Sequence, residues 1–383
     1  MGIHSKRQYL QTIRLRYKYA TRKQKSNILN EFCSVCGYNR KYAICLLNAT
    51  GTKKTKIKNK AGRRSIYHHP DILEVLMEIW KEAELPCATR LKEIIPDWLP
   101  HFKKFIIGDD IKEKLTGMSA STIDRLMAKS RPAFTRRGLA TTKPGSIIRK
   151  QIPVKTNQWD ESIPGFIEAD TVAHCGTTTE GSYVFSINCV DIATGWTEQR
   201  AIWGKDAQGT LEAIKDIEKT LPFTIKGFDC DNGSEFLNWH LVRYLTERKT
   251  PVAFTRARAY HKNDNAHVEG KNWTHIRQML GYQRFDNPKL THLLNELYTS
   301  EWNDYFNFFI PSVKLISKTR VGSKIKKIHD KPKTPFQRLI ESKHLDSQTT
   351  EHMKLYLRTL NPFDLHQQIK LKIKPIFKIV SRE

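Results

Sequence analysis

The chain has 383 residues, with 65 Lys or Arg against 39 Asp or Glu and a formal net charge of +26. Hydrophobic residues make up 39% of it, enough to build real cores, and the length predicts more than one domain. No stretch is long and apolar enough for a membrane span, the basic amino-terminus does not fit a secretory signal, and seven scattered Cys argue against a disulfide framework. We therefore expect a soluble cytoplasmic protein that binds a polyanion and no membrane.

The positive charge is concentrated in two tracts. Residues 1–66 contain 17 Lys or Arg and a single acid, Glu31, and residues 131–155 contain no acid at all. Such dense charge repels itself unless an anion lies against it, and the phosphate backbone of nucleic acid is the commonest such anion. An anionic membrane surface fits less well, because neither tract continues into a strongly amphipathic helix.

The first 52 residues have the pattern of three short helices. Apolar residues recur at helical spacing over residues 6–20 and 22–36, Gly37 ends the second helix, and Asn39 can cap a third. This arrangement suits a helix-turn-helix module whose third helix brings Arg40 and Lys41 to DNA. A plain three-helix bundle has the same pattern and remains the alternative.

A second helical segment covers residues 70–130, between a polybasic linker at 53–69 and a basic linker at 131–159. Its last helix, residues 119–127, has Ser119 as a cap and an apolar face, with Arg125 on the opposite face. We interpret the segment as a second helix-turn-helix module with Arg125 facing DNA. An ordinary helical domain is the alternative.

From residue 160 to 316 the sequence predicts an α/β domain. Three strand-like runs follow one another directly, and two more alternate with helical runs at residues 207–219 and 237–248. This order is typical of a mixed five-stranded sheet with flanking helices. The predicted strands are residues 166–172, 182–190, 196–202, 223–230 and 251–255.

Three acids occupy positions where a carboxylate is costly. Asp170 lies inside the first strand, Asp231 directly follows the fourth, and Glu269 heads the apolar side of a helix that begins near Asn265. The apolar stripe on that helix is Trp273, Ile276 and Leu280. Three acids directed at a core favour a divalent cation with oxygen ligands.

Three parts of this region together resemble the catalytic core of DDE transposases and retroviral integrases. They are Asp170, the segment Asp231-Asn-Gly-Ser-Glu-Phe, and the segment Tyr260-His-Lys-Asn-Asp-Asn-Ala-His-Val-Glu269-Gly-Lys-Asn. Within that family it is most similar to bacterial insertion-sequence transposases. The resemblance covers residues 160–320, with 37 residues between Asp231 and Glu269. It implies a ribonuclease H-like fold in which Asp170, Asp231 and Glu269 hold two Mg²⁺ ions, with Mn²⁺ as a substitute and Asp170 as the bridging ligand.

The resemblance also implies a function. The protein would bind the ends of a mobile DNA element and catalyse metal-dependent strand cleavage and strand transfer, as a homo-oligomer on duplex DNA in the bacterial nucleoid. DNA near the metals would meet His261, Lys262, Asn265, Lys271 and Arg277. Two alternatives are a ribonuclease H-like nuclease without strand transfer and an inactive, transposase-derived DNA-binding regulator.

Other acids near the three are assigned lesser roles. We expect Glu168 and Asp229 to be structural or to support the ligands, and Glu235 to be an acid of the first turn of a helix. After the core, residues 317–333 have the composition of a flexible, DNA-facing connector. The remaining residues to 383 predict a short helical tail.

Overall fold

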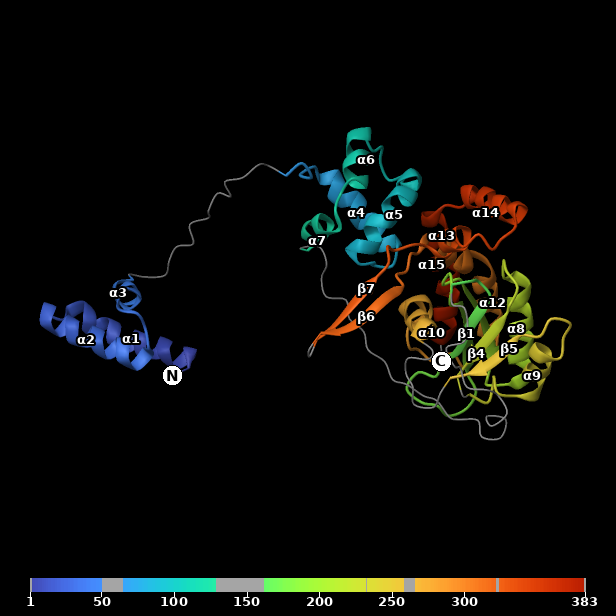
Figure 1. Ribbon diagram of the computed structural model, residues 1–383, viewed down its shortest axis with the longest axis horizontal. Coiled ribbons are helices and arrows are strands. Elements are labelled where there is room, and N and C mark those ends of the chain that lie inside the picture. Colours follow the sequence, from blue (N-terminus) through green and yellow to red (C-terminus); the bar gives the residue numbers. More distant parts are fainter. Residues whose placement is uncertain are drawn as a thin grey trace. The chain divides into compact units, whose positions relative to one another are not determined.

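The computed structural model describes residues 2–49, 65–128, 162–231, 233–257, 266–321 and 324–381. The chain divides into two compact units, Met1–Ser65 and Ile66–Glu383. Both are drawn in Figure 1. Within the described residues, none of the helices has the length and apolar character needed to span a membrane.

The first unit consists of three helices, α1 (Ile3–Tyr19), α2 (Arg22–Cys36) and α3 (Arg40–Asn48). Gly37 ends α2 in the left-handed conformation at φ 66°, and the Asn39 side chain accepts a hydrogen bond from the backbone of Lys41 to begin α3. The three predicted helices are confirmed, whereas their helix-turn-helix character remains a prediction. Their shared core contains Ile13, Tyr17, Ile28, Leu29, Phe32, Cys36, Ala43 and Leu47.

The second unit begins with four α-helices: α4 (Pro70–Glu82), α5 (Ala88–Trp98), α6 (Asp109–Thr116) and α7 (Ala120–Met127). A short 3₁₀ turn, η1 (Leu99–His101), follows α5. Their buried apolar side chains belong to the same cluster as those of the carboxy-terminal helices. These helices therefore pack as part of one unit with the rest of residues 66–383, not as the separate module that the sequence suggested.

A mixed five-stranded sheet is built from β1 (Phe166–Ala173), β2 (Val184–Asp191), β3 (Thr197–Trp203), β4 (Gly227–Cys230) and β5 (Ala253–Arg256). The strand order is β3-β2-β1-β4-β5. The first three strands form an antiparallel meander, and β4 and β5 continue the sheet in parallel with β1. The predicted mixed α/β sheet is confirmed.

The two faces of the sheet differ in polarity. One face packs its apolar side chains against α8 (Ala207–Thr220) and α9 (Trp239–Thr246). The opposite face of β1 carries Glu168 and Asp170, because side chains alternate along a strand. A helix covers this polar face and changes character along its length, from α10 (Ala266–Lys271) through the π-helical η3 (Asn272–Arg277) to α11 (Gln278–Leu280).

The carboxy-terminal region is more ordered than the sequence indicated. It contains α12 (Lys289–Leu297), the π-helical η4 (Tyr298–Trp302) and η5 (Tyr305–Phe309), β6 (Leu315–Val321), β7 (Lys324–His329), α13 (Pro335–Glu341), α14 (Ser347–Thr359) and α15 (Pro362–Val380). The connector predicted at residues 317–333 is instead an antiparallel hairpin of β6 and β7. The helices predicted after residue 333 are present, and α15 buries Ile369, Ile373 and Ile376 in the main apolar cluster.

Candidate active site

Asp170 and Asp231 lie side by side at the polar face of the sheet. In the parallel pairing of β1 with β4, Glu168 is opposite Asp229 and Ala169 is opposite Cys230. Asp170 and Asp231 are the next residues along these two segments, and both residues are half-buried. The strand register thus brings together two of the three predicted metal-binding acids.

Both carboxyl groups hold protons more tightly than usual. Burial, together with repulsion from the Asp231 carboxylate, raises the pKa of Asp170 to about 7. Burial and repulsion from Glu235 raise the pKa of Asp231. Crowding of this kind is relieved when a cation binds between the carboxylates.

Hydrogen bonds fix the Asp170 carboxylate at both oxygens. The backbone N–H of Thr171 donates to Oδ1 at 2.7 Å, and Asn272 Nδ2 donates to Oδ2 at 2.7 Å. Asn272 in turn accepts from Asn188 Nδ2 at 2.8 Å, and Asn188 accepts from Gln199 Nε2 at 2.9 Å. Gln199, Asn188 and Asp170 are direct cross-strand neighbours on β3, β2 and β1, so this amide chain follows the register of the sheet.

Glu235 is part of the acidic cluster, contrary to the prediction that it is a first-turn helix acid. It is 1% exposed and precedes α9, which begins only at Trp239. Its Oε1 accepts from Thr171 Oγ1 at 2.9 Å and pairs with Lys205 Nζ at 2.7 Å. Its Oε2 is buried and has no hydrogen-bond partner among the residues that the structure describes. A Cβ at Gly233 would lie 2.5 Å from Glu235 Oε2 and 2.8 Å from Asp231 Oδ1, so both carboxylates converge on this glycine.

Glu269 does not head an apolar stripe, and that prediction is wrong. Its side chain is exposed on α10, and Trp273, one turn further on, is 50% exposed. The backbone is π-helical from Asn272, with wider i→i+5 turns, so offsets counted at 3.6 residues per turn misplace the face. Val268 is the buried residue of this turn, and Glu269 lies in solvent on the helix that covers Asp170.

Glu168 and Asp229 have structural partners. Glu168 Oε2 accepts the backbone N–H groups of His267 and Val268 at 3.0 and 3.2 Å, which satisfies donors at the start of α10. Asp229 accepts a hydrogen bond from Thr255 Oγ1 at 2.5 Å across the strands β4 and β5. Both acids therefore help to hold the elements around Asp170 and Asp231.

The predicted DNA contacts have different surroundings. Arg40 and Lys41 are exposed on α3 of the first unit, and Arg125 is exposed on α7. Arg125 donates hydrogen bonds within its own helix, to the backbone oxygen of Ser121 and to Thr122 Oγ1. The predicted contacts His261, Lys262 and Asn265 lie outside the described residues.

The other two predicted contacts, Lys271 and Arg277, are held inside the fold. Lys271 is 9% exposed, its Nζ lies 3.2 Å from His275 Nε2, and burial lowers its pKa to about 7. Arg277 Nη2 donates to the backbone oxygen of Ala173 at 2.6 Å, and its guanidinium lies over the Tyr282 ring. In this arrangement both cations contact protein.

The acidic side chains around Asp170 offer oxygen ligands of the kind that hard cations prefer. Among the described residues, no three His, Cys, Asp or Glu side chains are arranged to hold one. Asp170 and Asp231 fit a hard cation as a pair, since each bears a raised pKa and the unpaired Glu235 Oε2 lies beside them. Glu269 is exposed on α10, the helix that is tied to the same face through the backbone N–H groups of His267 and Val268, which donate to Glu168.

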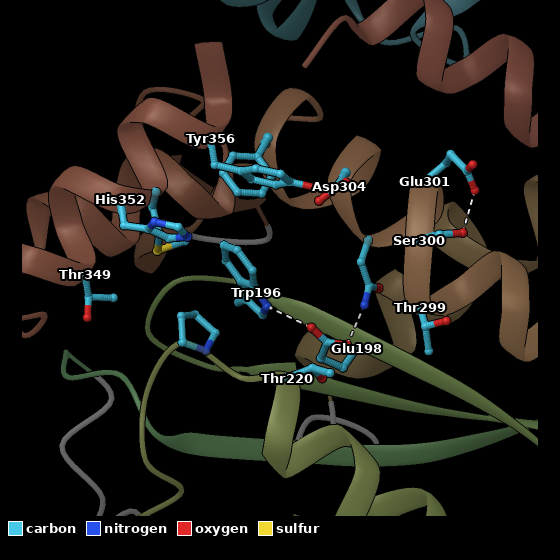
Figure 2. Close-up of a pocket in the computed structure, with 14 residues that line it drawn as sticks. Trp196, Glu198, Thr220, Thr299, Ser300, Glu301, Asp304, Thr349, His352 and Tyr356 are labelled. Carbon is cyan, nitrogen blue, oxygen red and sulfur yellow. Dashed lines mark hydrogen bonds between the residues drawn. The ribbon is translucent and has the colours of Figure 1, made fainter. Parts of the chain in front are cut away.

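A second acidic region lies at the edge strand β3, in a cavity of about 680 Å³ that shares no residue with the acidic cluster. Figure 2 shows Trp196 directed at Glu198 and Ser300 directed at Glu301. Glu198 pairs with Arg200 at 3.3 Å, and Glu301 pairs with Lys372 at 2.6 Å. Because protein cations already pair with these acids, the cavity is a weaker candidate for a metal site than the Asp170 cluster.

Sequence reasoning missed four side chains of the site: Asn188, Gln199, Asn272 and Lys205. One feature of the sequence could have identified two of them: Asn188 and Gln199 are polar residues within buried strands. The register that aligns these residues with Asp170 comes from pairing between strands distant in sequence, so it could not be read from the sequence pattern.

The five-stranded mixed sheet in the order β3-β2-β1-β4-β5, with its flanking helices, is the architecture that the sequence predicted for residues 160–316. The chain is 35% identical over 329 residues to the uncharacterized protein y4rM of Sinorhizobium fredii, covering 84% of this chain and 91% of that protein. The chain belongs to the family of y4rM. No protein-family model matches it.

Among solved structures, the chain is similar to the catalytic core domain of BIV integrase, with a TM-score of 0.30 and 15% identity. The match covers 47% of this chain and 96% of that domain.

Proposed function

We propose that the protein is a DDE-type transposase, which cuts DNA at the ends of a mobile element and joins the ends to target DNA. The observation that carries this proposal is the position of Asp170 on β1 next to Asp231, which directly follows β4, with the pKa of both carboxyl groups raised. In this proposal Asp170, Asp231 and Glu269 hold Mg²⁺ or Mn²⁺. The inactive-regulator alternative is disfavoured, because carboxylate crowding destabilises a protein that binds no cation.

The chemistry divides between the ions and the protein. Two bound ions would activate the attacking water or 3′-hydroxyl and stabilise the leaving oxygen. The chain's own residues orient the ligands: Thr171 and Asn272 fix Asp170, and the backbone N–H of Gly233 donates to Asp231 Oδ1 at 2.9 Å. Carboxylates held in this way need little reorganisation when a cation and a DNA strand arrive.

We assign DNA binding to the basic surfaces outside the sheet. The first unit supplies a large share of the positive charge, with Arg40 and Lys41 exposed on α3. Arg125 on α7 is exposed as well. Assembly as a homo-oligomer on duplex DNA belongs to the same proposal.

The test is a cleavage and joining assay with the full-length chain. The substrates are duplexes from the DNA that flanks the gene and a supercoiled target plasmid, with Mg²⁺ or Mn²⁺ present or chelated. Asp170→Asn, Asp231→Asn and Glu269→Gln should each reduce cleavage by ~10²-fold or more, because an amide cannot replace the ligand charge. DNA binding should persist in all three variants.

Asp229→Asn is the matched control, since Asn can still accept the Thr255 hydrogen bond. It should keep most of the activity. If Asp229→Asn lost cleavage and Asp231→Asn kept it, the metal ligand would be Asp229 and not Asp231. Metal-dependent cleavage without joined products would identify a nuclease instead, and normal cleavage in all four variants would rule out this active site.

A further inference from the structure

The hairpin of β6 and β7 is a second, separate sheet with a firmly held base. The backbone of Lys314 pairs with Asp330, and Ser312 pairs with Lys333. Asp330 also forms an ion pair with Arg338 at 2.5 Å. Figure 1 shows the two strands as one long ribbon. The base is therefore fixed to α13, which carries Arg338.

Beyond the base, the ribbon buries neither of its faces. Its described side chains are exposed apart from Ser317, and Ile316 and Ile325 are 67% and 57% exposed. An isolated two-stranded hairpin is only marginally stable in water. A ribbon with two exposed faces and apolar side chains in solvent therefore has the character of a surface that a partner covers.

The ribbon is basic throughout. The sequence from Leu315 to His329 contains five Lys or Arg and no acid. Lys318 is directly opposite Lys327, and the next pair on the same face is Arg320 with Ile325. Like charges directly across two strands are destabilising, so this row favours an anion lying over it.

We propose that the β6–β7 ribbon binds duplex DNA, with Lys318 and Lys327 on backbone phosphates. This inference rests on the proposed function and adds a DNA contact to it. The major groove admits a two-stranded ribbon, and exposed isoleucines suit the apolar contacts that thymine methyl groups offer. DNA fits better than an acidic protein, because the charge is repeated along the ribbon, as phosphates are repeated along a duplex.

The experiment measures binding of the full-length chain to a fluorescent duplex of about 30 base pairs, from ~50 to ~200 mM salt. The double variant Lys318→Gln, Lys327→Gln should bind more weakly at low salt. Its slope of log affinity against log salt should be shallower by about 1.8, since each lost phosphate contact removes about 0.9. Lys112→Gln, Lys354→Gln is the matched control, with two exposed lysines on α6 and α14, and its slope should match that of the unmodified chain.

Hydrogen exchange gives a local readout. Amides of residues 315–329 should gain protection when DNA is added to the unmodified chain and gain little in the ribbon variant. A ribbon variant with an unchanged salt slope and unchanged protection would overturn the inference. In that case, continued metal-dependent cleavage would leave the proposed function standing. An unmodified chain that binds no DNA even at low salt would overturn both.

Discussion

Asn272 donates a hydrogen bond to Oδ2 of Asp170 at 2.7 Å, which ties the helix that carries Glu269 to the central strand of the sheet. An ionised carboxylate only accepts, so Asn272 must present its amide N–H and turn its oxygen toward Asn188. The same constraint passes to Gln199, whose Oε1 is left buried without a donor. An unpaired buried acceptor is rare and costly. The hydrogen bonds that orient Asp170 are therefore formed at the expense of one at Gln199, the other end of this series of amides.

Asn272→Ala should weaken Mn²⁺ binding by about 10–100-fold, the range typical for loss of a group that orients a metal ligand. Mn²⁺ titration followed by electron paramagnetic resonance measures this directly, independent of cleavage. Gln199→Met, at the far end of the same chain, should change the affinity only a few-fold. Wild-type Mn²⁺ affinity in Asn272→Ala would show that the bond is purely structural.

Gly233→Ala should disrupt the acidic cluster while leaving DNA binding intact. The added Cβ would meet the carboxylates of Glu235 and Asp231 at 2.5 and 2.8 Å, so both would have to move. We expect a loss of Mn²⁺ binding of at least ~10-fold. Gly270→Ala is the control, because its Cβ would meet nothing within 4 Å although it adjoins Glu269. Equal metal affinity in the two variants would contradict this geometry.

The exposed edge of β3 is closed by two asparagines. Asn295 pairs with both backbone groups of Ala201 at 2.7 and 2.9 Å, and Asn307 pairs with both backbone groups of Thr197 at 2.9 Å. Side chains that imitate a neighbouring strand in this way prevent pairing with another chain.

Asn307→Leu should lower the free energy of unfolding by about 3 kcal/mol, since two buried backbone groups each lose a partner. Urea denaturation followed by circular dichroism measures the change. Gln208→Ala, which removes an exposed amide on α8, should stay within about 0.5 kcal/mol of the unmodified chain. A cost for Asn307→Leu no larger than that of the control would contradict the role of Asn307.

A buried histidine joins α15 to the end of α4. His366 is fully buried, with Nδ1 2.7 Å from Glu82 and Nε2 2.8 Å from Glu84. Burial alone would lower the pKa of His366, but the hydrogen bonds that His366 forms to both carboxylates outweigh this effect and raise that pKa. Burial would likewise raise the pKa of Glu82, but His366 and Lys370 lower it to about 2.

His366→Gln should therefore be most destabilising near pH 5–6. The raised pKa of His366 contributes stability that is full below its unfolded value of ~6.5 and is lost as pH rises through the folded value. The lowered pKa of Glu82 contributes stability above its unfolded value of ~4.3, which is lost as pH falls toward 2. The test is the unfolding midpoint of the unmodified protein and of His366→Gln, measured from pH 4 to 9. A difference between the two midpoints that grows steadily with pH would contradict the prediction.

The sequence by itself determined several helix boundaries and singled out Asp170 and Asp231, which the strand register places side by side. Asn39, Ser119 and Gly37 mark helix ends through their own hydrogen bonding and backbone freedom, so these boundaries follow from nearby residues. Asp170 and Asp231 could be singled out because a carboxylate in or beside a buried strand is costly wherever that strand lies.

Only the tertiary structure decided what surrounds these acids. The amide chain from Gln199 to Asp170 depends on register between strands, and the recruitment of Glu235 depends on a turn that brings it to Lys205. Glu269 and Trp273 are exposed whereas Ile276 and Leu280 are buried, and the backbone between them is π-helical, which 3.6-residue spacing does not predict. The strand register and the Glu235–Lys205 ion pair join residues that are distant in sequence, so no local pattern contains their free energy.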